Sequence, residues 1–298
     1  MSRKNDILWK GIMEGIFDDL LRFIFPDADH LVDIKKGFGF LDKELSEMYP
    51  EPKKAAETKF VDKLVKVYRP DGGEEWFLVH IEVQGYPDKT FAERMFRYYS
   101  RIYDRYQAPV TALAIFTGQN GKTMPNCYTY NFLGTSLVYK YNTCCITDYT
   151  DEDLMASNNP FALVVLAAKT ALLMGKKPEV ELMERKLLIA RLLHGKGIFS
   201  KKKIADVLTF LNNYIVFEDP QINRNFRQQL DLITGKTNTM GIIEQVAEMR
   251  VEEAREEERE EFAKSLLTET EFSAEKIASL AKVPLSVVEK IKERLNQQ

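Results

Sequence analysis

The first pattern along the chain is helical. Over residues 5–25, apolar residues recur at the spacing of one helix face: Ile7, Ile12, Ile16, Leu20 and Phe23. Pro26 ends this pattern because its ring cannot continue a helix. The sequence therefore predicts one N-terminal helix.

A β-rich block follows. Residues 59–69 and 75–84 are rich in β-branched and aromatic side chains, and the PDGG between them is typical of a turn. Residues 91–106 are again helical in pattern and end before Pro109. Three further strands are expected in residues 110–118, 127–134 and 136–147. A hairpin, a helix and then strands predict an α/β sheet with a crossover connection.

After Asp148 the pattern becomes entirely helical, with helices expected at 160–175, 178–193, 200–212 and 219–233. GKTNT at 235–239 has linker composition. Residues 242–267 predict a long Glu/Arg-rich helix with a thin apolar stripe, which is either solvated or paired with another chain. Two short helices around Val283–Pro284 complete the chain. We expect an α/β core at 1–150, a helical part of the same domain at 151–235, and a charged helix with a two-helix tail at 240–298.

Composition narrows the class of protein. The chain of 298 residues is 45% hydrophobic with 18 Phe and 13 Tyr, enough for a packed core. Its formal charge of −3 neither indicates nor excludes a nucleic-acid partner. Three cysteines without C-x-x-C spacing are typical of a reducing compartment. The charged N-terminus is unlike a signal peptide, and the apolar run 161–174 is too short to span a bilayer. We expect a cytoplasmic protein with no membrane partner.

The hairpin carries the candidate chemistry. A turn centred on Gly72 pairs Asp62 with Glu82 across the two strands. The opposite face is almost wholly apolar and is expected to lie in the core, and Lys63 is its only polar residue. Its apolar residues are Val61, Val65, Val67, Phe77, Val79, Ile81 and Val83. Two opposed carboxylates repel unless a cation relieves them, and Mg²⁺ prefers such oxygens. The alternative is that both acids are merely exposed at strand ends, and a slip of one residue would put Asp62 on the wrong face.

These residues resemble a known family. Asp62, followed 20 residues later by Glu82-Val83-Gln84, resembles the D-x(n)-E-x-Q variant of the PD-(D/E)XK nucleases. More narrowly, the chain is similar to the recombination-promoting nuclease (Rpn-like) and putative transposase group, in which a helix carrying R-x-x-x-Y follows; Arg94 and Tyr98 fit that pattern. The resemblance covers about residues 1–235, and the group also commonly carries a charged helix and a small helical tail.

The resemblance implies a restriction-endonuclease-like mixed sheet flanked by helices, with an all-helical C-terminal extension. It implies a metal-dependent DNA endonuclease that is associated with recombination or mobile elements, in which Asp62 and Glu82 hold Mg²⁺ or Mn²⁺. Gln84 stands at the position where the common motif has Lys. Because Gln carries no charge, the positive side chain of the site must come from elsewhere. Arg94 and Arg97 are the nearest candidates, and Lys66 lies farther along the hairpin face.

Several residues have two possible roles. The first helix of such folds often supplies another metal-binding carboxylate, and Glu14 with Asp18 at i, i+4 could do so; a solvated polar face is the alternative. Arg94 is either a phosphate contact held by Tyr98 or the rim of an aromatic packing face. His80 is either a ligand or base, or a satisfied core histidine.

The tail has helix-turn-helix character. Ser273 can cap its first helix, and Ser286 with Glu289 forms a capping box for the second. Lys290 and Lys292 give the second helix a basic side that could contact DNA. The alternatives are that these C-terminal helices form a homodimer or fold back on the Glu-rich helix. A small shared core is expected from Ile277, Leu280, Val283, Val287, Ile291 and Leu295.

Three functions are therefore compared. The first is a metal-dependent deoxyribonuclease acting on DNA. The second is a catalytically weak or inactive DNA-binding relative, which would bind duplex DNA with steep salt dependence. The third is an oligomerising interaction protein without affinity for DNA.

Overall fold

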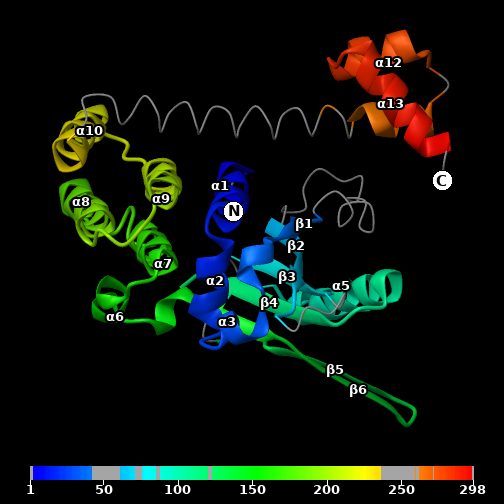
Figure 1. Ribbon diagram of the computed structural model, residues 1–298, viewed down its shortest axis with the longest axis horizontal. Helices are drawn as coiled ribbons and strands as arrows, with labels where there is room; N and C mark the ends of the chain where they lie inside the picture. The colour runs from blue at the N-terminus through cyan, green and yellow to red at the C-terminus, as the bar shows by residue number, and fades with distance from the viewer. Residues whose placement is uncertain are drawn as a thin grey trace. The chain divides into compact units, whose positions relative to one another are not determined.

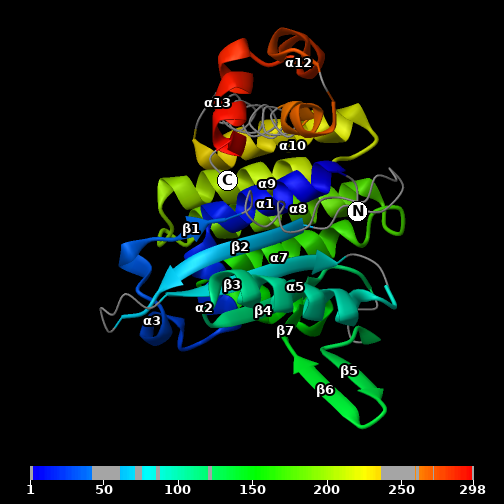
Figure 2. The same ribbon diagram turned by 90° about the vertical axis from the view of Figure 1, so that its right-hand side faces the viewer.

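The computed structural model describes residues 3–41, 61–70, 76–84, 88–119, 123–235, 259, 262–270 and 272–296. The chain divides into two compact units, Met1–Met240 and Gly241–Gln298. Figures 1 and 2 show the elements of both units.

The first unit is built on a five-stranded sheet with the order β1-β2-β3-β4-β7. The strands are β1 (Gly39–Phe40), β2 (Val61–Tyr68), β3 (Trp76–Gln84), β4 (Val110–Phe116) and β7 (Asn142–Cys145). β1, β2 and β3 pair antiparallel, whereas β3, β4 and β7 pair parallel. The predicted mixed α/β class is confirmed.

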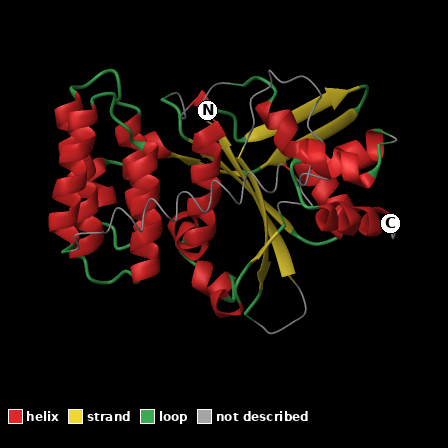
Figure 3. Cartoon of the chain, turned by 90° about the horizontal axis from the view of Figure 1, so that it is seen from above, coloured by secondary structure: helices red, strands yellow, loops and turns green. Residues whose placement is uncertain are grey.

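Helices cover both faces of this sheet (Figures 1 and 3). α5 (Phe91–Tyr106) lies on one face, and α1 (Arg3–Gly15), α2 (Phe17–Ile24) and α7 (Pro160–Ala171) lie on the other. α7 is buried along nearly its whole length, because apolar residues occupy almost every position of its sequence. The predicted helix at 91–106 is confirmed at both ends.

The helical half of the unit follows the predicted segments closely. It consists of α6 (Asp151–Ala156), α7, α8 (Glu179–Gly195), α9 (Lys201–Tyr214) and α10 (Pro220–Thr234). Side chains cap several of these helices, as Ser200 does by accepting a hydrogen bond from the backbone N–H of Lys203. Short elements complete the unit: α3 (Ala28–Leu31) and the 3₁₀ turns η1 (Ile34–Lys36) and η3 (Ile146–Asp148).

Two predictions about element boundaries are wrong. The single N-terminal helix is two helices, because Ile16 has non-helical dihedrals (φ −137°, ψ 39°) between α1 and α2. The strand expected at 136–147 is also two strands, β6 (Thr135–Lys140) and β7, which turn at Tyr141. β6 pairs with β5 (Cys127–Phe132) in a separate two-stranded ribbon instead of joining the main sheet.

The second unit is a small helical cluster. Residues 262–269 are helical, followed by α12 (Ala274–Ala281) and α13 (Leu285–Asn296). Ser273 caps α12 as predicted, by accepting a hydrogen bond from the N–H of Lys276. The core of the second unit consists of Ala263, Ile277, Ala281, Val288 and Ile291. The expected core residue Leu280 is 47% exposed, because Ala281 takes the inward position of that turn.

Candidate functional site

The paired strands β2 and β3 hold the residues with candidate chemistry. The backbone register places Asp62 opposite Glu82 and Leu64 opposite His80, which confirms the predicted pairing. On the other side of β3, Glu82 pairs with Ala114 and Gln84 with Phe116 in the parallel ladder to β4. The side chains of Asp62, His80, Glu82 and Gln84 lie outside the described residues, so the observation concerns backbone positions.

Lys63 occupies the face of β2 away from these positions, since successive residues of a strand lie on opposite faces. Its side chain is 1% exposed. The ammonium forms an ion pair with Glu14 of α1 and lies 5.1 Å from the centre of the Phe40 ring. The apparent misfit of the apolar face is therefore an ion-paired core residue.

This ion pair also locates Glu14, which the sequence offered as a metal ligand. Glu14 meets the sheet on the Lys63 face, which is the side away from register positions 62 and 82. Asp18, its proposed companion, lies beyond the break at Ile16 and forms ion pairs with Arg22 and Lys203. Glu14 thus has a partner other than a metal ion, and we leave it out of the ligand set proposed below.

α5 covers the face that includes register positions 62, 64, 82 and 84. Phe91 and Met95 pack with Ala114 and Phe116 of β4. Farther along the helix, Tyr98 and Ile102 pack with Leu64 of β2. The aromatic packing face considered in the sequence is confirmed, and the first turns of α5 lie over the part of β4 that pairs with Glu82 and Gln84.

Arg94 projects from this first part of α5 and is partly buried. Its Nη1 lies 2.6 Å from Oδ2 of Asp88, and its guanidinium lies 5.2 Å from the centre of the Phe91 ring. Asp88 also accepts hydrogen bonds of 2.8 Å from the N–H and the hydroxyl of Thr90. Burial by itself raises the pKa of Asp88, but hydrogen bonds from Thr90 and Arg94 outweigh it and hold the pKa below its ordinary value of 3.8. Asp88 is therefore a carboxylate that orients Arg94.

Sequence reasoning missed Asp88, although a signal was present. An Asp two residues before a Thr at the start of a helical pattern is typical of a helix-initiating turn. The acid also lies 6 residues before Arg94, which a loop leading into a helix can bring back to the first turn.

The other predicted cations are more exposed. Arg97 forms an i, i+4 ion pair with Glu93, and its side chain is 67% exposed. Lys66 lies with its ammonium 5.3 Å from the centre of the Tyr68 ring. In the second unit, Lys290 and Lys292 are both exposed on α13. Arg97, Lys290 and Lys292 keep the access to solvent that a phosphate contact requires, and their DNA-binding role stays a prediction.

Two general features bear on the class of site. Within the described side chains, which exclude those of Asp62 and Glu82, no three His, Cys, Asp or Glu residues gather closely enough to hold a metal ion. No helix in the described part of the chain combines the length and the apolar character needed to cross a membrane.

Comparison of the chain with protein-family models, with curated proteins and with solved structures found no match.

Proposed function

We propose that this protein is a metal-dependent DNA endonuclease with a PD-(D/E)XK-type site formed by Asp62, Glu82 and Gln84. The observation that carries the proposal is the register of the hairpin, which puts Asp62 opposite Glu82. Directly opposed residues of an antiparallel pair have Cα atoms roughly 4.5–5.5 Å apart, so two acids at this position form a pair of neighbouring charges.

The donor set fits a hard divalent cation. Asp62 and Glu82 offer carboxylate oxygens, which are the ligands that Mg²⁺ and Mn²⁺ prefer. When bound, such an ion polarises a phosphate and lowers the pKa of a coordinated water. Asp62 and Glu82 would hold it, and Gln84 would orient the attacking water through its amide, without adding charge.

Arg94 supplies the positive charge that Gln84 lacks. It comes from the helix that covers this face of the sheet, and Asp88 fixes its guanidinium. A guanidinium can contact a phosphate oxygen with one edge while its other nitrogens stay paired with a carboxylate. We therefore assign Arg94 to the scissile phosphate and Asp88 to its positioning.

The order of elements supports the same proposal. The N-terminal helices α1, α2 and α3 and the turn η1 come before three antiparallel strands, β1, β2 and β3, and helix α5 and the parallel strand β4 follow these strands. This is a mixed sheet flanked by helices, as the resemblance to restriction-endonuclease-like folds implies. The helical segment from α6 to α10 then belongs to the extension of that fold.

The test is plasmid cleavage by the purified full-length chain. We expect nicking of supercoiled DNA with Mg²⁺ or Mn²⁺, no nicking with EDTA, and binding without cleavage when Ca²⁺ replaces Mg²⁺. Asp62→Asn and Glu82→Gln should each lower the rate by at least about a hundredfold, because removal of one ligand charge weakens metal binding. Gln84→Lys should keep or raise the rate.

Asp104→Asn is the matched control, since Asp104 is an exposed Asp on α5 outside the proposed site. Its rate should equal that of the wild type. DNA retention without metal-dependent nicking would favour the inactive DNA-binding relative, and absence of both would refute the proposed function.

A further inference from the structure

The two-stranded ribbon β5–β6 projects from the body of the first unit (Figures 1 and 2). We call residues 127–140 the arm. Among the described strands, these two pair only with each other. Each has 6 residues, so the arm extends about 20 Å at roughly 3.3 Å per residue. A two-stranded hairpin is marginally stable by itself, and its unpaired edges favour association with another strand.

The tip of the arm is apolar and exposed. Phe132 is 61% exposed and Leu133 is 90% exposed. Leu133 and Gly134 both have positive φ, at 44° and 83°, as the two central residues of a type I′ turn do. Asn is the favoured residue at the first of these positions, whereas a leucine there is strained. An exposed leucine at a position that favours Asn indicates that the apolar side chain serves an interaction.

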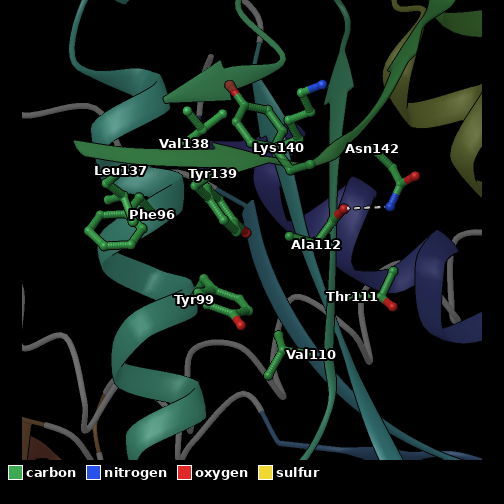
Figure 4. A pocket seen from close by; sticks show the side chains of 11 residues that line it. Phe96, Tyr99, Val110, Thr111, Ala112, Leu137, Val138, Tyr139, Lys140 and Asn142 are labelled. Carbon is green, nitrogen blue, oxygen red and sulfur yellow. Dashed lines mark hydrogen bonds between the residues drawn. The ribbon is translucent and has the colours of Figure 1, made fainter. Parts of the chain in front are cut away.

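A pocket of about 480 Å³ lies at the base of the arm. Figure 4 shows Phe96 and Tyr99 of α5, the start of β4, and Tyr139 of β6 around it. Among the residues that the structure describes, the buried hydroxyl of Tyr139 has no hydrogen-bond partner. Within the described ladders, β4 pairs with β7 only from Leu113 onward, and the side-chain amide of Asn142 donates a 3.1 Å hydrogen bond to the carbonyl of Ala112, so Val110 and Thr111 lie outside the ladder on that side. The pocket therefore offers aromatic side chains beside polar ones, the Tyr139 hydroxyl and a short stretch of strand edge.

The chemistry of the arm selects its partner. Residues 123–139 contain no charged side chain, so the tip lacks the Lys and Arg that phosphate backbones require. A lipid bilayer would leave the polar groups of the open strand edges unsatisfied. A protein surface with a strand edge and a pocket that has both aromatic and polar lining residues satisfies both requirements, and this chain carries one. The extended arm holds its own tip away from its own base, so the pocket that receives the tip belongs to a second copy.

We propose that two copies of this chain exchange arms about a twofold axis, with Phe132 and Leu133 of each tip seated in the pocket at the base of the partner's arm. The volume of the pocket equals roughly sixteen water molecules at about 30 Å³ each, which accommodates two apolar side chains. The arms run antiparallel, so their free edges pair along their length. This contact is self-complementary and closes at two copies.

The first test is the oligomeric state of the full-length chain, measured by light scattering and analytical ultracentrifugation at up to about 100 µM, where interfaces with micromolar Kd are populated. Leu133→Asn suits the positive φ of the turn, so it keeps the hairpin intact while removing the apolar tip. We expect it to raise the dimer Kd at least about thirtyfold, as loss of a central apolar anchor does. The matched control is Leu232→Asn on α10, where Leu232 is 78% exposed; this variant should leave the Kd unchanged.

The second test is a cross-link between two differently tagged chains in a Cys127→Ser background. One chain carries Leu133→Cys at the tip and the other carries Thr111→Cys in the pocket, and a short bismaleimide reagent joins them. We expect a mixed dimer from this pair and none from Leu232→Cys with Thr111→Cys.

The proposal is overturned if the wild type stays monomeric. It is also overturned if Leu133→Asn leaves the Kd unchanged and the tip-to-pocket cross-link does not form. Binding to neutral lipid vesicles that depends on Leu133, in a chain that stays monomeric, would assign the tip to a membrane surface instead.

Discussion

Gly15 ends α1 at the point where this helix meets α9, and an alanine there tests how closely the two helices approach. A Cβ added to Gly15 would lie 2.6 Å from Oδ2 of Asp206, 2.8 Å from its Cγ and 3.1 Å from its Cβ. Asp206 is 6% exposed, so its side chain cannot move into solvent. Gly15→Ala therefore forces the helices apart or displaces a buried carboxylate.

The expected magnitude is the sum of two opposing effects. Alanine in place of glycine favours a helix by at most about 1 kcal/mol, and overpacking a tight contact costs roughly 1–3 kcal/mol. Gly15→Ala should thus lower the free energy of unfolding by up to about 2 kcal/mol. In an Asp206→Ala background the two closest atoms are gone, and the same change should be neutral or stabilising. The coupling between the two positions should be about 1–3 kcal/mol.

Urea unfolding followed by far-UV circular dichroism measures these differences. Gly195→Ala is the matched control, because Gly195 also ends a helix and a Cβ there would meet nothing within 4 Å. A Gly15→Ala chain as stable as the Gly195→Ala chain would refute the reasoning. A loss of stability that persists fully in the Asp206→Ala background would refute it as well.

Two further predictions concern charged residues in the helical half, one half-buried and one buried. Burial alone raises the pKa of Asp151, but the neighbouring Lys169 and Arg185 outweigh burial and hold the pKa below 3.8. Asp151→Asn should therefore lower the free energy of unfolding by roughly 1–2 kcal/mol at pH 7. This difference from wild type should vanish as the pH falls below the pKa of Asp151 in the folded state, which urea midpoints measured from pH 7 to pH 2 would show. The side chain of Lys186 is 1% exposed, its ammonium donates hydrogen bonds to two backbone carbonyl oxygens at the end of α9, and it lies 3.9 Å from the centre of the Phe226 ring. Lys186→Met should lower the free energy of unfolding by about 1–3 kcal/mol, because those carbonyls lose a charged donor. A thermal midpoint equal to that of wild type would contradict this prediction.

The register of the β2–β3 hairpin was predictable because three local signals agree. The turn sequence PDGG marks its centre, the strands have similar lengths, and one face is apolar at every position except Lys63. A shift by one residue would turn the face that includes Val65 and Val67 away from the core, where both are fully buried. Burial of an apolar face fixes register strongly, so the pairing of Asp62 with Glu82 followed from the pattern.

The break at Ile16 was not predictable from periodicity. Ile12, Ile16 and Leu20 are all buried, so the apolar spacing continues across the break. Gly15 was the local signal, and the close approach of Asp206 explains why glycine stands there. Contacts between segments distant in sequence decide such breaks, and a single-segment pattern does not contain them.

The side-chain partners of charged residues also could not be predicted from the spacing of apolar and polar residues. Lys63 looked like a misfit because its partner, Glu14, lies 49 positions earlier in the chain. The sequence predicted a metal-binding role for Glu14 from its position on the first helix. The same helix instead uses that carboxylate to neutralise a buried ammonium, which a lone strand pattern cannot reveal.

This pairing changes the charge balance of the proposed nuclease site. Without Glu14, the site has two carboxylates, Asp62 and Glu82, which one divalent cation neutralises. The negative charge that develops on a phosphate during cleavage must then be met by Arg94, since Gln84 is neutral. Arg94 already shares its charge with Asp88. Electrostatic stabilisation is therefore weaker than in a site with an unpaired lysine at position 84, and the proposed enzyme should turn over slowly while depending strictly on its metal.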